Sequence, residues 1–242
     1  MSIPRPSASL VVVAQNQLLF MRRPTRGTFP SMHVFPGGVV EKGDPGPSYC
    51  ALRETYEETG LLISPHLKDG PVVLPQEEGS HSYEAAVEHL TGKNAKDGVD
   101  WSDPESFGLR PISKWITPTT APKRFEAQFY VYSIPAPFPV SHIKNREVEL
   151  LEWLSPSQAL DNFKAGKLSF MPPQFYIITA ILEKGVQGAV DALRNRTFRP
   201  APKRKFKDGR LELDWGQGES GIVTTDKTSG WISSIEYIRS NL

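Results

Sequence analysis

The chain has 242 residues, which is enough for one sizeable domain or for one domain with extensions. Hydrophobic residues make up 38% and charged residues 23% of the sequence, as in soluble globular proteins rather than disordered or membrane proteins. With 28 Lys and Arg against 27 Asp and Glu, the net charge is +1, which argues against nucleic-acid or membrane binding through global charge. The single cysteine, Cys50, can form neither an internal disulfide nor a thiolate zinc site, so we expect a reducing compartment.

The first third of the chain predicts a hairpin and then a helix. Two β-rich runs in residues 8–22 flank Gln15–Gln17, and a short strand is expected over residues 32–35. The run from Ser48 contains no internal Gly or Pro and ends at Gly60, which predicts a helix with Ser48 as its N-cap and Gly60 just after its end. The apolar residues 61–64 follow as a strand.

The rest of the chain alternates strands and helices. Residues 65–110 are polar and punctuated by Gly and Pro, and we expect a surface insertion with one helix at 83–90. Further strands are predicted at 114–117, 124–134, 147–153, 210–215 and 221–225, and further helices at 155–163 and 172–196. This alternation favours an α/β sandwich with a mixed sheet.

Three glutamates of the first predicted helix share one face. Glu54, Glu57 and Glu58 are spaced i, i+3 and i+4, so their side chains project from one side of a helix. A divalent cation would remove their mutual repulsion, and oxygen ligands suit the hard ions Mg²⁺ or Mn²⁺. The alternatives are a solvated acidic face and a simple salt bridge between Arg53 and Glu57.

The residues around these glutamates resemble a known motif. The run RETYEETG (53–60), preceded by FPGG (35–38), is similar to the Nudix box, with Gly37 and Gly38 as its start. The resemblance implies a Nudix α/β/α sandwich and a metal-dependent enzyme that hydrolyses a nucleoside diphosphate linked to another group. It also implies that Glu54, Glu57, Glu58 and the carbonyl of Gly38 hold the metal, with Glu54 as the alternative water-orienting base. Arg53 would pair with a helix glutamate and orient it.

The chain departs from the usual box at one acidic position. The box has a Glu six residues after its glycine and seven residues before its Arg, whereas this chain has Asp44 six residues after Gly38 and then eight residues to Arg53. An apolar residue is also usual where Thr55 stands. The shorter side chain of Asp44 and the longer loop before Arg53 should affect the stability of the loop more than metal binding. We therefore expect activity to be retained.

A second acidic segment lies later in the chain. NREVELLEW (145–153) resembles the segment in which many Nudix enzymes carry a further acidic residue. Glu147 is the candidate catalytic residue there, and Glu149 is the next. Both could instead be outward-facing strand residues.

Several segments resemble the Nudix subgroup that includes the mammalian peroxisomal coenzyme A diphosphatase. They are residues 18–40, 115–118, 122–130 and 167–175. The resemblance implies coenzyme A, or a related nucleoside diphosphate derivative, as a small-molecule substrate. Because that substrate is anionic, the arginines of these segments are candidate substrate-binding residues, and an aromatic ring could stack on its base. The candidates are Arg22, Arg23, Arg26, Arg124 and Phe125. Each could equally be a surface or core residue.

The sequence does not settle the substrate, the role of the C-terminal tail or the cellular compartment. The alternatives are another diphosphate (ADP-ribose, a dinucleotide, capped RNA or a prenyl diphosphate) and a non-hydrolytic Nudix-like binding module. We expect a Nudix domain over residues 1–196 and an extension over 197–242, in which the basic run 199–207 is read as a solvated loop. We expect a cytoplasmic protein without membrane or nucleic-acid partners. The end Ser240-Asn241-Leu242 is weakly similar to the peroxisomal address SKL, which makes the peroxisome the alternative.

Overall fold

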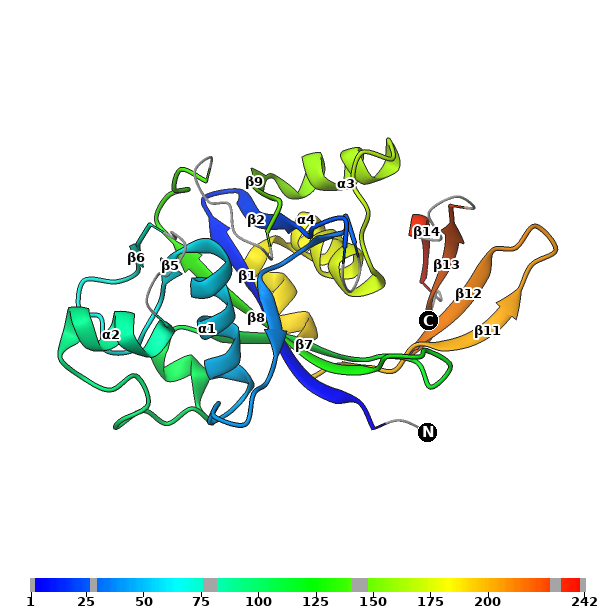
Figure 1. Ribbon diagram of the computed structural model, residues 1–242. Helices are drawn as coiled ribbons and strands as arrows, with labels where there is room; N and C mark the ends of the chain where they lie inside the picture. Colours follow the sequence, from blue (N-terminus) through cyan, green and yellow to red (C-terminus); the bar gives the residue numbers. More distant parts are fainter. Residues whose placement is uncertain (1–2, 27–29, 76–81, 141–147, 227–231, 240–242) are drawn as a thin grey trace.

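The computed structural model describes residues 3–26, 30–75, 82–140, 148–226 and 232–239. It is a mixed α/β fold with a central mixed sheet and a second, smaller sheet toward the C-terminus (Figure 1). The central sheet has the strand order β10-β7-β8-β1-β2-β3, with β4 paired to β1 and β9 paired to β2. Its strands are β1 (Arg5–Ala14), β2 (Gln17–Arg22), β3 (His33–Val34), β4 (Gly37–Val39), β7 (Arg110–Ile116), β8 (Phe125–Ile134), β9 (Leu150–Leu154) and β10 (Thr197–Phe198).

The central sheet is covered on both faces, because alternate residues of a strand point to opposite sides. In β1, Leu10 and Val12 pack into one core cluster and Val11 and Val13 into the other. The first cluster contains helices α1 (Pro47–Thr59) and α2 (Tyr83–Thr91). The second contains α3 (Pro156–Lys164) and α4 (Pro172–Leu193). The predicted sandwich is confirmed.

Along one of its edges, strand β1 pairs with two different strands. Near its C-terminal end it pairs with β2, in the predicted hairpin, and Gln15 turns the chain with φ 55°. Nearer its N-terminal end, Ser7–Ser9 pair with Gly37–Val39 of β4. The glycines of the FPGG run are therefore fixed by a strand ladder directly in front of α1.

Helix α1 begins two residues earlier than the sequence predicted. Its N-cap is Gly46 and Pro47 occupies the first turn, where a fixed φ and a missing N–H cost nothing. The prediction that Ser48 is the N-cap is wrong, because Ser48 lies inside the helix and its hydroxyl donates to the carbonyl of Trp101 at 2.7 Å. The predicted end is confirmed, since Gly60 closes the helix with φ 74°.

The insertion of residues 65–110 contributes to the core beside α1. It contains β6 (Val72–Val73), which pairs with β5 (Leu61–Leu62), then α2 and a 3₁₀ turn at Pro104–Phe107. Tyr83 and Trp101 are buried against Tyr49 of α1, with edge-to-face ring contacts at 5.3 and 4.9 Å. The insertion therefore supports α1 from the side away from the sheet.

The C-terminal region forms a four-stranded antiparallel sheet. Its strands are β11 (Ala201–Lys205), β12 (Leu211–Gly216), β13 (Glu219–Thr225) and β14 (Ile232–Arg239). The interpretation of 199–207 as a loop is wrong, because β11 runs through this segment as an exposed edge strand. The sheet packs on the α4 side of the molecule through Trp215 and Tyr237, whose rings contact Tyr176 of α4 at 5.5 and 5.4 Å. No described helix is long and apolar enough to cross a membrane.

Candidate active site

The candidate site lies where α1 faces the glycine strand β4. Arg53, with a side chain only 7% exposed, is at the centre of an ion-pair cluster. Its Nε and Nη2 donate to the two carboxylate oxygens of Asp44 at 3.0 and 2.9 Å. Its Nη1 lies 3.0 Å from Glu54 Oε1 and 2.9 Å from Glu57 Oε2. One buried guanidinium therefore holds three carboxylates, and its fork geometry explains why an arginine stands here.

Asp44 takes the place of the longer acid that the motif usually provides. It accepts two hydrogen bonds from Arg53 and one from the backbone N–H of Glu41 at 2.9 Å. The side chain of Asp44 is only 3% exposed. This geometry agrees with the expected stabilising role in the loop.

Glu58 is held separately from the other two glutamates. Its Oε2 accepts the backbone N–H of Gly37 at 2.8 Å, and the residue is 2% exposed. A side chain at Gly37 would place a Cβ 2.2 Å from the carbonyl oxygen of Ala8, and one at Gly38 would place a Cβ 2.4 Å from the Glu54 carboxylate. The two glycines therefore allow β4 to pass between β1 and the carboxylates of α1.

Burial and neighbouring charges shift the pKa values of Glu57 and Arg53. Burial raises the pKa of Glu57 above its usual value, although the neighbouring Arg53 acts to lower it. Burial acts to lower the pKa of Arg53, but the hydrogen bond to Asp44 and the charges of Glu54, Asp44 and Glu57 outweigh it and raise that pKa. Arg53 therefore stays charged.

A metal ion would find many oxygen donors here, but the carboxylates do not converge on one point. Within the described ranges, no group of three or more His, Cys, Asp or Glu side chains is arranged to hold a metal. Glu54 and Glu57 nevertheless meet at one nitrogen of Arg53, so their carboxylates are neighbours. Glu57 is 40% exposed, which leaves it room to rotate. The chemistry of the donors fits a hard divalent cation.

Cys50 is a contact of the site that its sequence position did not reveal. Its buried thiol donates to the carbonyl of Gly38 with an Sγ···O distance of 3.7 Å and lies 3.8 Å from Arg53 Nη2. Burial raises the pKa of this thiol, so it stays protonated and can donate. The sequence predicted no partner for Cys50, because the contact joins residues twelve apart across β4 and α1.

Most of the substrate-binding candidates lie at the same end of the central sheet as Gly37 and Gly38. Phe125 begins β8 opposite Arg5 of β1, and Arg124 precedes it with Nε donating to the Thr117 carbonyl at 3.2 Å. Arg22 ends β2 and donates to Glu149 at 2.9 Å.

The other candidates are less closely tied to the site. Arg23 is half-buried just after β2, and Arg26 is exposed. Glu147 lies outside the described residues, whereas Glu149 is described and is the ion-pair partner of Arg22. The catalytic and binding roles of all these residues remain predictions.

Comparisons with known proteins decide the family. The sequence model of the NUDT19 Nudix domain matches residues 46–181, more than half of the chain. The chain belongs to the Nudix hydrolase family. The match includes Arg53 and the three glutamates of α1.

Similar proteins carry related names. The chain is 30% identical over 185 residues to "Putative nudix hydrolase 7" of Caenorhabditis elegans, covering 73% of this chain and 60% of that protein. It is 26% identical over 243 residues to the acyl-coenzyme A diphosphatase NUDT19 of Gallus gallus, covering 71% and 62%. The chain thus spans about three fifths of the length of these relatives. A crystal structure of a Nudix hydrolase from Alicyclobacillus acidocaldarius shares the fold, with TM-score 0.60, 22% identity and coverage of 80% and 98%.

Proposed function

We propose that this Nudix family member is a metal-dependent diphosphatase that hydrolyses the pyrophosphate bond of coenzyme A or an acyl derivative of it. The observation that carries the proposal is the cluster in which buried Arg53 holds Asp44, Glu54 and Glu57 beside the glycine strand. The names of the avian and human relatives, which are acyl-coenzyme A diphosphatases, support the choice of substrate.

Some residues of this site would bind the metal, and others would position the residues that bind it. Glu54, Glu57, Glu58 and the Gly38 carbonyl would hold Mg²⁺ or Mn²⁺, which when bound supplies charge neutralisation at the diphosphate and an activated water. Arg53 fixes Glu54 and Glu57 through its Nη1, and Gly37 fixes Glu58 through its N–H. Arg22, Arg23 and Arg124 would bind the phosphates of the substrate through charge-assisted hydrogen bonds.

A substrate panel tests the proposal. Coenzyme A, an acyl-coenzyme A, ADP-ribose and NADH are incubated with the full chain and Mg²⁺ or Mn²⁺, and the products are identified. We expect coenzyme A and its acyl derivative to yield 3′,5′-ADP, and we expect EDTA to abolish the reaction and added metal to restore it. Preferred cleavage of ADP-ribose or NADH would contradict the substrate assignment while keeping the enzyme class.

Two variants test the site within the same assay. Glu57→Gln and Glu58→Gln should each lower kcat roughly 100-fold, the scale expected when one preorganised charged group is lost. In Glu58→Gln the amide oxygen can still accept the Gly37 N–H, so the fold should survive. Glu88→Gln, on the exposed face of α2, is the matched control and should keep full activity. Unchanged rates in both site variants would show that the chemistry occurs elsewhere.

A non-hydrolytic binding module is the second candidate. It is favoured by the pairing of each of the three glutamates with a protein donor, Arg53 or the Gly37 N–H, instead of their convergence on one point. Binding of coenzyme A with no product under either metal would support this alternative.

A further inference from the structure

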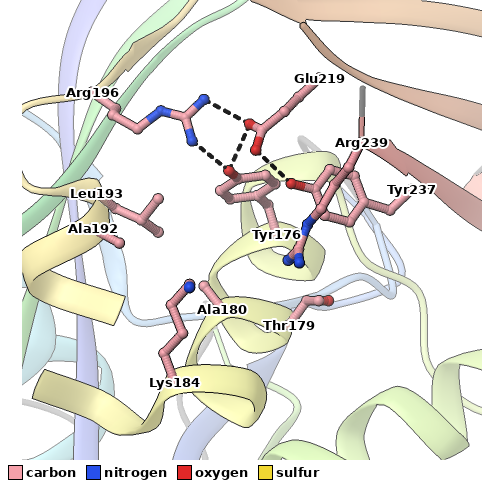
Figure 2. Close-up of a pocket in the computed structure, with 10 residues that line it drawn as sticks. All are labelled: Tyr176, Thr179, Ala180, Lys184, Ala192, Leu193, Arg196, Glu219, Tyr237 and Arg239. Atoms are coloured by element: carbon pink, nitrogen blue, oxygen red, sulfur yellow. Dashed lines mark hydrogen bonds and ion pairs between the residues drawn. The ribbon is translucent and has the colours of Figure 1, made fainter. Parts of the chain in front are cut away.

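A cavity of about 250 Å³ lies between α4 and the C-terminal sheet, at the break in this helix. Its walls come from both halves of α4, from Arg196 just after the helix, and from β13 and β14 (Figure 2). Since α4 and α1 cover opposite faces of the central sheet, this cavity is separate from the candidate active site.

Among the described residues that line the cavity, Glu219 is the one carboxylate, and protein donors already bind both of its oxygens. Its Oε2 accepts hydrogen bonds from Arg196 Nη2 at 2.6 Å and from the Tyr176 hydroxyl at 2.7 Å, and its Oε1 accepts the Tyr237 hydroxyl at 2.7 Å. Arg196 also donates to the Tyr176 hydroxyl at 2.7 Å. The charges of Glu219 and Arg196 therefore cancel within the wall.

Two more cations line the cavity, and one of them, Lys184, gives it a positive balance. Lys184 and Arg239 reach toward the space beneath the Tyr176 ring from two sides (Figure 2). Arg239 forms a solvent-exposed ion pair with Glu183, which offsets part of its charge. Among the described residues, no carboxylate lies within ion-pair distance of the Lys184 ammonium. The field inside the cavity therefore favours an anion.

Most of the remaining wall is apolar, and a backbone kink shapes it. Ala180 and Leu193 line the cavity together with the Tyr176 ring. Gly185 breaks the helix with φ 68° and ψ 172°, a conformation that is accessible essentially only to glycine. The kink follows Lys184 directly, so the two halves of α4 form two different walls.

We infer that this cavity binds a small organic anion. Its phosphate or carboxylate group sits between Lys184 and Arg239, and its apolar body packs against Leu193, Ala180 and the Tyr176 ring. The volume is below the roughly 300–1,000 Å³ of pockets that hold drug-sized ligands, so the occupant is smaller than a whole dinucleotide or coenzyme A. The site would join the C-terminal sheet to α4 whenever the anion is present.

A binding titration with simple probes tests this inference. The full chain is titrated with phenyl phosphate, benzoate, inorganic phosphate and the neutral benzyl alcohol, at constant ionic strength and with EDTA to remove metal-dependent binding. Tryptophan fluorescence is the readout, because Trp215 stacks beside Tyr237 and contacts Tyr176. We expect the aromatic anions to bind more tightly than inorganic phosphate, and benzyl alcohol not to bind. The ratio of phenyl phosphate to benzoate affinity identifies the preferred anionic group.

Matched variants separate this cavity from general surface charge. Lys184→Ala and Arg239→Ala should each weaken binding of the aromatic anions roughly tenfold, with unchanged melting temperature in the absence of ligand because both side chains are exposed. Lys203→Ala, an exposed lysine on β11 that is paired with Glu212, is the control and should bind like the unmodified chain. Equal affinity in all four proteins, or no binding of either aromatic anion, would overturn the inference.

Discussion

Arg53 is the residue on which the organisation of the candidate active site depends most. It is buried, yet its charge is balanced by Asp44, Glu54 and Glu57 together. A buried charge that loses its partners costs far more than the same charge at the surface. The cluster therefore either stays complete or loses both stability and the positions of the α1 glutamates.

Asp44→Asn tests this dependence, because it removes the charge of Asp44 and converts one of its two acceptor atoms into a donor facing Arg53. We expect the free energy of unfolding to fall by about 3 kcal/mol, the usual cost of breaking a buried pair. Diphosphatase kcat should also fall, because Arg53 no longer holds Glu54 and Glu57 in place. Urea unfolding and steady-state kinetics measure the two effects. Glu41→Gln, an exposed acid in the same loop, is the control, and a similar loss there would contradict the role of Asp44.

The two glycines of β4 allow positioning to be separated from folding. In Gly37→Ala the new Cβ meets the backbone oxygen of Ala8 at 2.2 Å, which cannot move without disturbing β1. In Gly38→Ala the three nearest atoms all belong to the carboxylate of Glu54, the flexible end of a side chain. We therefore expect Gly37→Ala to lower the melting temperature strongly. Gly38→Ala should keep most of its stability but lose at least roughly tenfold in kcat, in line with the cost of misplacing one site group. Full activity in folded Gly38→Ala protein would show that Glu54 is not needed at that position.

At the scale of the elements, the sequence predicted local structure well wherever the signal was itself local. The hairpin at Gln15–Gln17, the stop at Gly60 and the Ser-Pro start of α3 were all predicted, and Ser155 forms a complete capping box with Gln158. The box motif likewise located Arg53 and its glutamates. Such features depend on residues within one helical turn or one hairpin.

Features that depend on distant partners were missed or misassigned. Strand β11 is a basic, exposed edge strand with no apolar alternation, so only its pairing with β12 reveals it. Ser48 resembled an N-cap because its true partner, the Trp101 carbonyl, lies 53 residues away. Neither the cavity at α4 nor the contact of Cys50 with Gly38 has a signature in sequence spacing.

Substitutions at Ser48 distinguish its two possible roles. Aspartate is a good N-cap but cannot donate to a carbonyl when ionised, whereas threonine can do both. Because Ser48 is buried and donates to Trp101, Ser48→Asp should destabilise the protein by roughly 3 kcal/mol, and Ser48→Thr should cost much less. Thermal unfolding monitored by circular dichroism measures both. Equal stability of the aspartate variant and the unmodified chain would restore the N-cap interpretation.

At the scale of the whole molecule, the C-terminal sheet is joined to the Nudix core by aromatic packing and one half-buried carboxylate. Trp115 of β7 stacks on Phe198 at 4.2 Å and contacts Trp215 at 5.9 Å, so one aromatic cluster spans both sheets. Glu219 connects the same elements through its bonds to Arg196, Tyr176 and Tyr237. We therefore expect the predicted extension 197–242 to unfold together with the Nudix core rather than as an independent unit.

The pH dependence of stability tests this connection at Glu219. Burial acts to raise the pKa of Glu219, but its hydrogen bonds from Arg196, Tyr237 and Tyr176 outweigh burial and lower that pKa below the usual value. A carboxyl whose pKa is lowered in the folded state contributes stability above its unfolded pKa, about 4.3, and loses it as the pH falls through the folded pKa. Glu219→Gln should therefore lower the free energy of unfolding at pH 7 by roughly 2 kcal/mol, the scale of a charge-assisted hydrogen bond.

The difference between the unmodified chain and Glu219→Gln should then shrink steadily below about pH 4, because protonation makes Glu219 neutral as well. Urea unfolding at a series of pH values measures it. Glu236→Gln, on the exposed side of β14, should show almost no difference at any pH. Two separate transitions in the unmodified chain at pH 7 would contradict a jointly folding molecule. A pH-independent cost of Glu219→Gln would show that the shape of this side chain, and not its charge, joins the C-terminal sheet to α4.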